Sequence, residues 1–298
     1  MGKSDYRFIP VMKDSKEFKA LVSLLDDPDD SVYNNISDRL ISYGADVIPA
    51  LEGHWEGSLD SQIQERIENI IHRIQFDQCH VRLHHWVQEG GGNLLDGALI
   101  IASYQYPDLN EDLVRQQIAR IRADIWIELN DNLTALEKVR IFNHILYDVH
   151  GFSGNTRNYQ SPVNSYINSV LETKKGNPLS LGLVYCVLAK DLGLPIQGVN
   201  MPEHFILAYL DENGILGKGD NVIFYINAFN HGAIFNRPEM FRFLRKLGKD
   251  PEKEDLDPCS NITFIHRLTN NLLYSYRKAG LTEKVDEIRE LQQAFMTV

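Results

Sequence analysis

Residues 176–195 have the sequence GNPLSLGLVYCVLAKDLGLP, which predicts a helix buried on every side. Asn177 is a favourable N-cap and Pro178 suits the first helical position, while the closing glycine and proline form a stop signal. Between these signals the charged residues are Lys190 and Asp191, both in the last turn. A helix that is apolar all round lies inside a protein, and this one spans about 22 Å. We therefore expect it at the centre of the fold.

Two apolar runs downstream predict strands that pack on this helix. They are HFILAYL at residues 204–210 and VIFYI at residues 222–226, rich in the aromatic and β-branched residues typical of buried strands. A polar, glycine-containing loop lies between the two runs. The pattern predicts an antiparallel hairpin.

The register of this hairpin determines which residue lies opposite His204. If Leu210 faces Val222, antiparallel pairing places His204 opposite Ala228 and next to Asn227. A slip of one residue would instead pair His204 with Asn227 directly. Both registers remain open at this point.

The helix start, the strand histidine and the neighbouring asparagine match the plan of a Cys-His-Asn or Cys-His-Asp acyl-transfer site. The order and spacing of these elements, with Gly-Leu-Pro between the helix and His204, resemble the transglutaminase-like (papain-like) core superfamily. In that family the nucleophilic cysteine stands at the start of the buried helix, two residues after a glycine. The corresponding residue here is Pro178, which has no nucleophilic atom. The resemblance implies the fold and not the activity.

A longer set of motifs resembles one bacterial subgroup of this superfamily, the SirB-type transglutaminase-like proteins. The motifs are DGALIIA at 96–102, YPD at 106–108, GF at 151–152 with Asn155 and Tyr159, PVNSYIN at 162–168, GNPLSL at 176–181, PEHF at 202–205 and FNHG at 229–232. Together they are specific, although no single one of them is. Relatives commonly carry aspartate in the last motif, and Asn227 is a further departure from a standard triad.

The remaining segments predict helices, so the expected fold class is α+β, predominantly helical, with one small antiparallel sheet. Residues 1–89 resemble a HEAT-type unit, because short amphipathic helices are separated by an acidic proline turn. Residues 90–248 contain the transglutaminase-like core, and residues 249–298 resemble a TPR-like helical hairpin. We interpret the run Gly90-Gly91-Gly92 as a flexible linker, because no phosphate-binding Gly-Lys-Ser/Thr follows it.

Composition disfavours several classes of function. The formal net charge of −11 disfavours nucleic-acid binding, because an acidic surface repels phosphate backbones. Three cysteines without regular spacing argue against a disulfide framework and favour a reducing, cytoplasmic location. No secretion signal is visible, and no apolar run reaches the ~18 residues of a membrane span. The partner is therefore expected to be a protein or peptide, while the oligomeric state is left open.

No cofactor and no metal site are expected. His80 and His84, with His85 and Cys79 nearby, have the spacing of two ligands on one helix face. A third ligand is not evident, and no glutamate follows the first histidine as it does in zinc metalloproteases. A solvated or interdomain helix face is the preferred interpretation.

Ser180 is the one hydroxyl in the first turn of the buried helix. As a nucleophile it would need His204 as a base within about 3 Å and Asn227 to orient that base. Ser180 lies about 200° around the helix from position 178, so we expect it to face away from His204 and cap its own helix. The sequence supports two interpretations of His204 equally: a relict catalytic base, or a histidine of the core. Cys186, more than two turns along, is interpreted as a small core residue.

Four polar residues are predicted to line a cleft near the helix start: Asn164, Tyr166, Asn177 and Glu203. For Asn164 and its neighbours there is an alternative. These side chains can instead fix the loop before the helix through side-chain-to-backbone hydrogen bonds.

The preferred hypothesis is a non-catalytic transglutaminase-like protein that acts as a protein-interaction or regulatory module, because Pro178 replaces the nucleophile and helices flank the core. The alternative is a hydrolase or acyl-transferase that uses Ser180, His204 and Asn227, with helix amides as the oxyanion hole. A third hypothesis is a cleft for a small ligand or peptide at the place of the family's active site.

Overall fold

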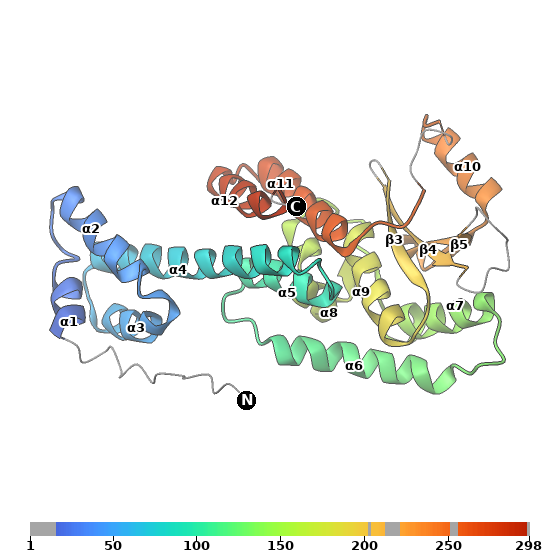
Figure 1. Ribbon diagram of the computed structural model, residues 1–298, viewed down its shortest axis with the longest axis horizontal. Coiled ribbons are helices and arrows are strands. Elements are labelled where there is room, and N and C mark those ends of the chain that lie inside the picture. The colour runs from blue at the N-terminus through green and yellow to red at the C-terminus, as the bar shows by residue number, and fades with distance from the viewer. Residues whose placement is uncertain (1–15, 202–203, 212–220, 251–255, 297–298) are drawn as a thin grey trace. The chain divides into compact units, whose positions relative to one another are not determined.

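The computed structural model describes residues 16–201, 204–211, 221–250 and 256–296 (Figure 1). The chain divides into two compact units, Met1–Arg82 and Leu83–Val298. Among the described residues both units are mainly helical, and the strands lie in the second unit. The predicted class, α+β and predominantly helical, is confirmed.

The first unit packs short helices around one apolar cluster. Its described part contains α1 (Lys16–Ser23), α2 (Asp30–Ile41), α3 (Ile48–Gly57) and the first turns of α4 (Ser61–Gln88). Fully buried members of the cluster are Phe18, Leu25, Leu40, Val47, Leu51 and Ile67. The buried guanidinium of Arg66 donates to the carbonyls of Leu25 and Asp27 at 2.6 and 2.8 Å. These bonds hold the acidic turn between α1 and α2.

Helix α9 (Pro178–Asp191) lies at the centre of the second unit, as its apolar sequence predicts. Each residue from Leu179 to Ala189 is buried. Helices that pack on α9 are α5 (Leu94–Gln105), α6 (Glu111–Glu128) and α8 (Ile167–Thr173). On another side α9 meets the sheet, where Gly182 leaves room for the side chains of Phe205 and Leu207.

A four-stranded antiparallel sheet covers α9, with the strand order β3-β4-β5-β6. The strands are β3 (Ile196–Met201), β4 (His204–Leu210), β5 (Val222–Asn227) and β6 (Ala233–Phe235). Helix α10 (Arg237–Lys246) covers the opposite face, where Met240 and Leu244 join a cluster with Ile206 and Ala208. Figure 1 shows α9 and α10 on the two sides of the sheet. The outer strands β3 and β6 were not predicted.

The second unit contains further helices, as expected for a predominantly helical fold. Helix α7 (Ala135–Asn143) continues directly into a π-helix, His144–Val149. Helices α11 (Asn261–Ala279) and α12 (Thr282–Gln292) form the predicted C-terminal pair, and α11 also packs on α5 and β3. The helix pair thus lies in the same compact unit as the core. The division into regions 1–89, 90–248 and 249–298 stays a prediction.

The run Gly90-Gly91-Gly92 is an anchored turn, and its interpretation as a flexible linker is wrong. The amide of Gly91 donates to the carbonyl of Trp86 at 2.9 Å and closes the end of α4. The carbonyls of Gly91 and Gly92 accept hydrogen bonds from Asn261 and Lys190, each at 2.8 Å. Gly91 has a φ of 66°, which favours glycine. The run therefore ties the end of α4 to α11 and α9.

The hairpin of β4 and β5 adopts a register that differs from both alternatives. Leu210 pairs with Val222 as assumed, but an irregularity next to Leu210 shifts the ladder by one residue. The regular pairs then end at Leu207 and Ile226. His204 pairs with neither Ala228 nor Asn227, and its partner is Met201 of β3. A local bulge of this kind leaves no signal in a hydrophobic pattern.

Candidate functional site

The start of α9 is closed by a reciprocal pair of hydrogen bonds. The Ser180 amide donates to Asn177 Oδ1 at 2.9 Å, and the Asn177 amide donates to Ser180 Oγ at 3.0 Å. Pro178 occupies the first turn, where its missing amide proton costs nothing. Ser180 is 2% exposed. Its hydroxyl is therefore engaged in capping the helix.

His204 belongs to the face of the sheet that α10 covers. Its ring lies edge-on to Phe243 of α10, with the ring centroids 5.5 Å apart. Side chains alternate along a strand, so His204 shares its face with Ile206, which packs in the cluster beneath α10. The neighbouring Phe205 points to α9 instead. Ser180 and the ring of His204 therefore lie on different sides of the sheet.

Asn227 serves the turn that follows β5. It pairs with Ala233 of β6, and its Oδ1 accepts from the amides of Phe229 and Asn230 at 3.1 and 3.2 Å. This is the ordinary use of asparagine at the start of a turn. Among the described residues, no hydrogen bond joins Ser180, His204 and Asn227.

A small cavity of about 90 Å³ lies in front of Pro178. Its wall combines Asn177 and Pro178 of α9, the β4 residue His204, and Arg267 and Asn271 of α11. Helix α11 therefore covers the place where the family resemblance puts the active site. The remaining space suits a small chemical group.

Asn164, predicted as a cleft residue, fixes the loop before α8. Its side-chain amide donates to the carbonyls of Asn158 and Tyr159 at 2.6 and 3.1 Å, and its Oδ1 accepts from Asn155 at 2.8 Å. Asn164 does not line the small cavity. Its contacts are those of the loop-fixing alternative. Of the other predicted cleft residues, Asn177 lines the cavity.

Tyr166, predicted as a cleft residue, is buried and makes a hydrogen bond to α11. It is 1% exposed, and its hydroxyl shares a 2.5 Å hydrogen bond with that of Tyr276. Tyr276 also donates to Gln105 Oε1 of α5 at 3.0 Å. Burial raises the pKa of Tyr166 well above its usual value, so the hydroxyl stays protonated. The fourth predicted cleft residue, Glu203, lies outside the described residues.

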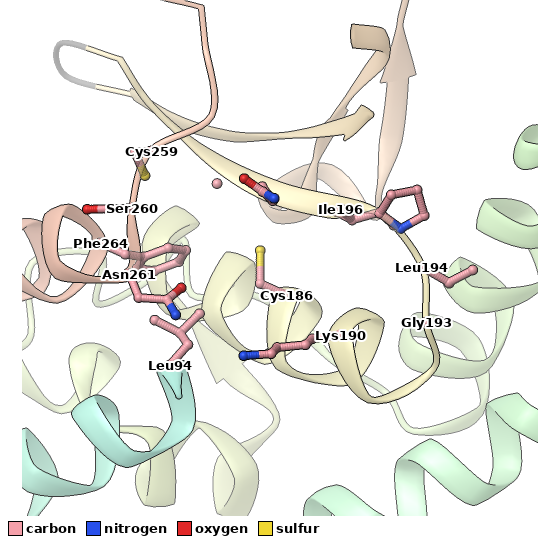
Figure 2. A pocket seen from close by; sticks show the side chains of 13 residues that line it. Leu94, Cys186, Lys190, Gly193, Leu194, Ile196, Cys259, Ser260, Asn261 and Phe264 are labelled. Atoms are coloured by element: carbon pink, nitrogen blue, oxygen red, sulfur yellow. The ribbon is translucent and has the colours of Figure 1, made fainter. Parts of the chain in front are cut away.

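A larger cavity of about 540 Å³ lies further along α9 (Figure 2). Cys186 and Lys190 of α9 face it together with Cys259 and Asn261, which precede or begin α11. The Lys190 ammonium donates to the carbonyl of Gly92 at 2.8 Å. Sequence reasoning missed this cavity, because its walls come from segments far apart in the chain.

We expect Cys186 to react with iodoacetamide at least about tenfold more slowly in the native protein than in the unfolded chain. Burial raises the pKa of its thiol far above the usual range, with Cys259 as a smaller cause, and the thiolate is the reactive form. Mass spectrometry of time points at pH 8, with and without urea, measures the two rates. Partly exposed Cys259 is the internal comparison. Equal rates for Cys186 in both states would contradict this prediction.

The histidines near the end of α4 make surface pairs. His85 Nδ1 lies 3.2 Å from Glu89 Oε2, and His84 contacts the side chain of Gln88. Within the described residues, no group of three or more histidine, cysteine, aspartate or glutamate side chains could hold a metal ion. The same residues include no helix with the length and apolar content to span a bilayer.

The profile described as "Transglutaminase-like superfamily" matches residues 112–270. That range contains α9, the four-stranded sheet and the residues of α11 up to Asn270. No solved structure matches the chain.

Curated relatives cover part of the chain. It is 31% identical over 189 residues to a UPF0162 protein of Xylella fastidiosa, which corresponds to 60% of this chain and 63% of that protein. It is 38% identical over 158 residues to F-box only protein 21 of Homo sapiens, or 52% of this chain and 24% of that protein. A UPF0162 protein of Vibrio cholerae is 28% identical over 137 residues, which corresponds to 46% of this chain and 48% of that protein. The match thus spans less than two thirds of each relative.

Proposed function

This chain belongs to the transglutaminase-like superfamily, and we propose that it is a member without acyl-transfer activity whose core serves as a protein-interaction or regulatory module. One observation carries the proposal: Pro178 stands at the helix start where the family resemblance expects the nucleophilic cysteine. A proline side chain offers no atom that can attack a carbonyl group. Any activity would need another nucleophile.

The geometry around Ser180 supports the same proposal. A serine hydroxyl is a weak nucleophile and needs an aligned base within about 3 Å. Ser180 is bonded to Asn177, and the ring of His204 lies against Phe243 on the other side of the sheet. The alternative, a hydrolase or acyl-transferase built on Ser180, His204 and Asn227, therefore has no supporting contact among the described residues.

An interaction role is supported by what surrounds the core. We propose that the helices before the core are HEAT-like and that the helix pair after it is TPR-like. The SirB-type likeness of the core belongs to the same proposal. A similar segment forms about a quarter of F-box only protein 21 and 63% of a bacterial UPF0162 protein. The segment thus occurs in proteins that differ in their remaining parts, as expected of a module that is combined with different domains. We extend the proposal to a protein or peptide partner, a cytoplasmic location and no nucleic-acid binding.

Activity assays on the purified full chain test the proposal. We expect no amidase, esterase or transamidase turnover above buffer, and no change in Ser180→Ala or His204→Ala. His204→Ala is expected to lower the free energy of unfolding by about 1 kcal/mol, through the lost ring packing on Phe243. A turnover rate that disappears in both variants would promote the hydrolase alternative.

A variant in which the nucleophile is restored provides a second and sharper test of the proposed function. Pro178→Cys is expected to remain inactive, because the ring of His204 is held against Phe243 of α10, although His204 and Pro178 both line the small cavity. Thiol labelling of the variant reports whether the new cysteine is activated. Turnover in Pro178→Cys that is lost in the double variant with His204→Ala would show that His204 can reach the helix start.

A further inference from the structure

Arg267 brings an uncompensated positive charge to the cavity in front of Pro178. It lines the cavity and is partly buried, yet it forms no ion pair or hydrogen bond within the described residues. Burial lowers the pKa of its guanidinium, and the neighbouring Tyr159 opposes that shift to a smaller extent. Arginine nevertheless stays charged in proteins. A charge in this position normally acquires a partner, because removing it from water is costly.

The wall of the cavity holds no carboxylate among the described residues that line it. The wall thus differs in charge from the chain as a whole, which contains 41 acidic residues against 30 lysines and arginines. The negative partner that Arg267 lacks is therefore not supplied by the described part of the wall.

Helix α11 presents neutral polar groups beside this charge. Arg267, Asn271 and Tyr274 are spaced four and three residues apart, so they share one face of the helix, and all three line the cavity. The side chain of Asn271 also has no hydrogen-bond partner among the described residues. Pro178 and Phe205 add apolar surface. One charged group and a few amide side chains, among them Asn271, beside apolar surface are typical of a small ligand site.

The face of α11 that carries these groups is held in place. The hydroxyl of Tyr166 binds that of Tyr276 on α11, and the Ser260 side chain caps the helix start by accepting from the Thr263 amide at 3.1 Å. A side chain on a fixed helix loses less freedom when it binds, which favours a defined site.

We propose that this cavity binds a carboxylate group of a peptide or protein partner, with the guanidinium of Arg267 as the charged donor and the amide of Asn271 as a neutral donor. This inference rests on the proposed function, because the carboxylate occupies the place where the family resemblance puts the reacting group. The two oxygens of a carboxylate match the fork of a guanidinium. A space of about 90 Å³ suits a group of this size.

Nuclear magnetic resonance on the ¹⁵N-labelled full chain tests the proposal through the Arg267 Nε–Hε signal. Three probes are titrated at low salt: acetyl-Gly-Gly with a free carboxylate, its C-terminal amide, and acetyl-Asp methylamide. We expect a saturable shift with at least one carboxylate probe and none with the neutral amide. The free dipeptide represents a chain terminus and the aspartate derivative a side chain, so the stronger binder identifies the source. Equal shifts with the neutral amide, or no shift with either carboxylate, would overturn the proposal.

Variants on α11 assign the binding to Arg267. Arg267→Gln is expected to weaken the better carboxylate probe by about tenfold or more, and Arg267→Lys to weaken it less. Arg277→Gln removes the same charge from the exposed end of α11 and is expected to bind as the wild type does. Circular dichroism melting confirms that each variant is folded. Unchanged binding in folded Arg267→Gln would overturn the proposal, as would tighter binding of inorganic phosphate than of both carboxylates.

The two proposals fail separately. Acyl-transfer turnover would contradict the proposed function and leave the carboxylate titration unaffected. Absence of carboxylate binding in an inactive protein would remove this inference alone.

Discussion

Leu188→Ala is expected to lower the free energy of unfolding by about 2–5 kcal/mol, the range for emptying a core leucine site. Leu188 lies in the middle of α9 and is 0% exposed. Helices pack closely on one side of α9 and the sheet packs on the other. The surrounding side chains therefore have little freedom to move into the space that the leucine side chain leaves. Urea unfolding followed by circular dichroism measures the change.

Leu113→Ala is the matched control for this experiment. Leu113 is a leucine on helix α6 with 55% of its surface exposed. Its loss is expected to cost less than about 0.5 kcal/mol, as is usual at surface positions. A cost below half a kcal/mol for Leu188→Ala as well would mean that α9 is not the buried centre of the unit.

Gly232→Ala is expected to cost about 2–5 kcal/mol, the sum of a left-handed backbone and an overpacked contact. Gly232 has a φ of 68°, and an added Cβ would overlap the side-chain amide of Asn143. That amide donates to the Gly232 carbonyl at 2.9 Å and accepts from the Tyr185 hydroxyl at 3.0 Å. Moving Asn143 aside would break both bonds near the centre of the unit.

Gly193→Ala separates the two causes. Gly193 has the same φ of 68°, but an added Cβ there meets no atom within 4 Å. We expect this variant to lose about 1–2 kcal/mol, from backbone strain alone. Thermal and urea unfolding of both variants give the comparison. Equal losses would show that Asn143 moves aside without penalty, contrary to the packing described above.

Elements with strong local signals agree with the sequence prediction. Asn177, Pro178 and the apolar run after them predicted α9, and dense aromatic and β-branched residues predicted β4 and β5. The outer strands gave weaker signals. β6 has three residues, and β3 (IQGVNM) mixes polar and apolar side chains, so neither run stands out from a loop.

The candidate site was predictable only in part. Ser180 was expected to cap α9 because a helix sets the angle between positions 178 and 180, and the observed hydrogen bonds fit that expectation. The position of His204 depended on its strand neighbours. The face of the sheet on which His204 lies follows from strand pairing and from the packing of α10, which begins over thirty residues later in the chain. The residues around His204 in the sequence determine neither of these.

The amino-acid sequence alone was enough to identify the family fold, the buried central helix and the proline where the family resemblance expects the nucleophile. These features depend on local hydrogen bonds, side-chain periodicity and residue chemistry, which act over a few positions of the chain. The register of β4 against β5, the side of the sheet that holds His204 and the meeting of Arg267 and Pro178 in the wall of one cavity came from the folded structure. Each depends on contacts between elements far apart in sequence, where a one-residue bulge or the docking of α11 changes which side chains meet.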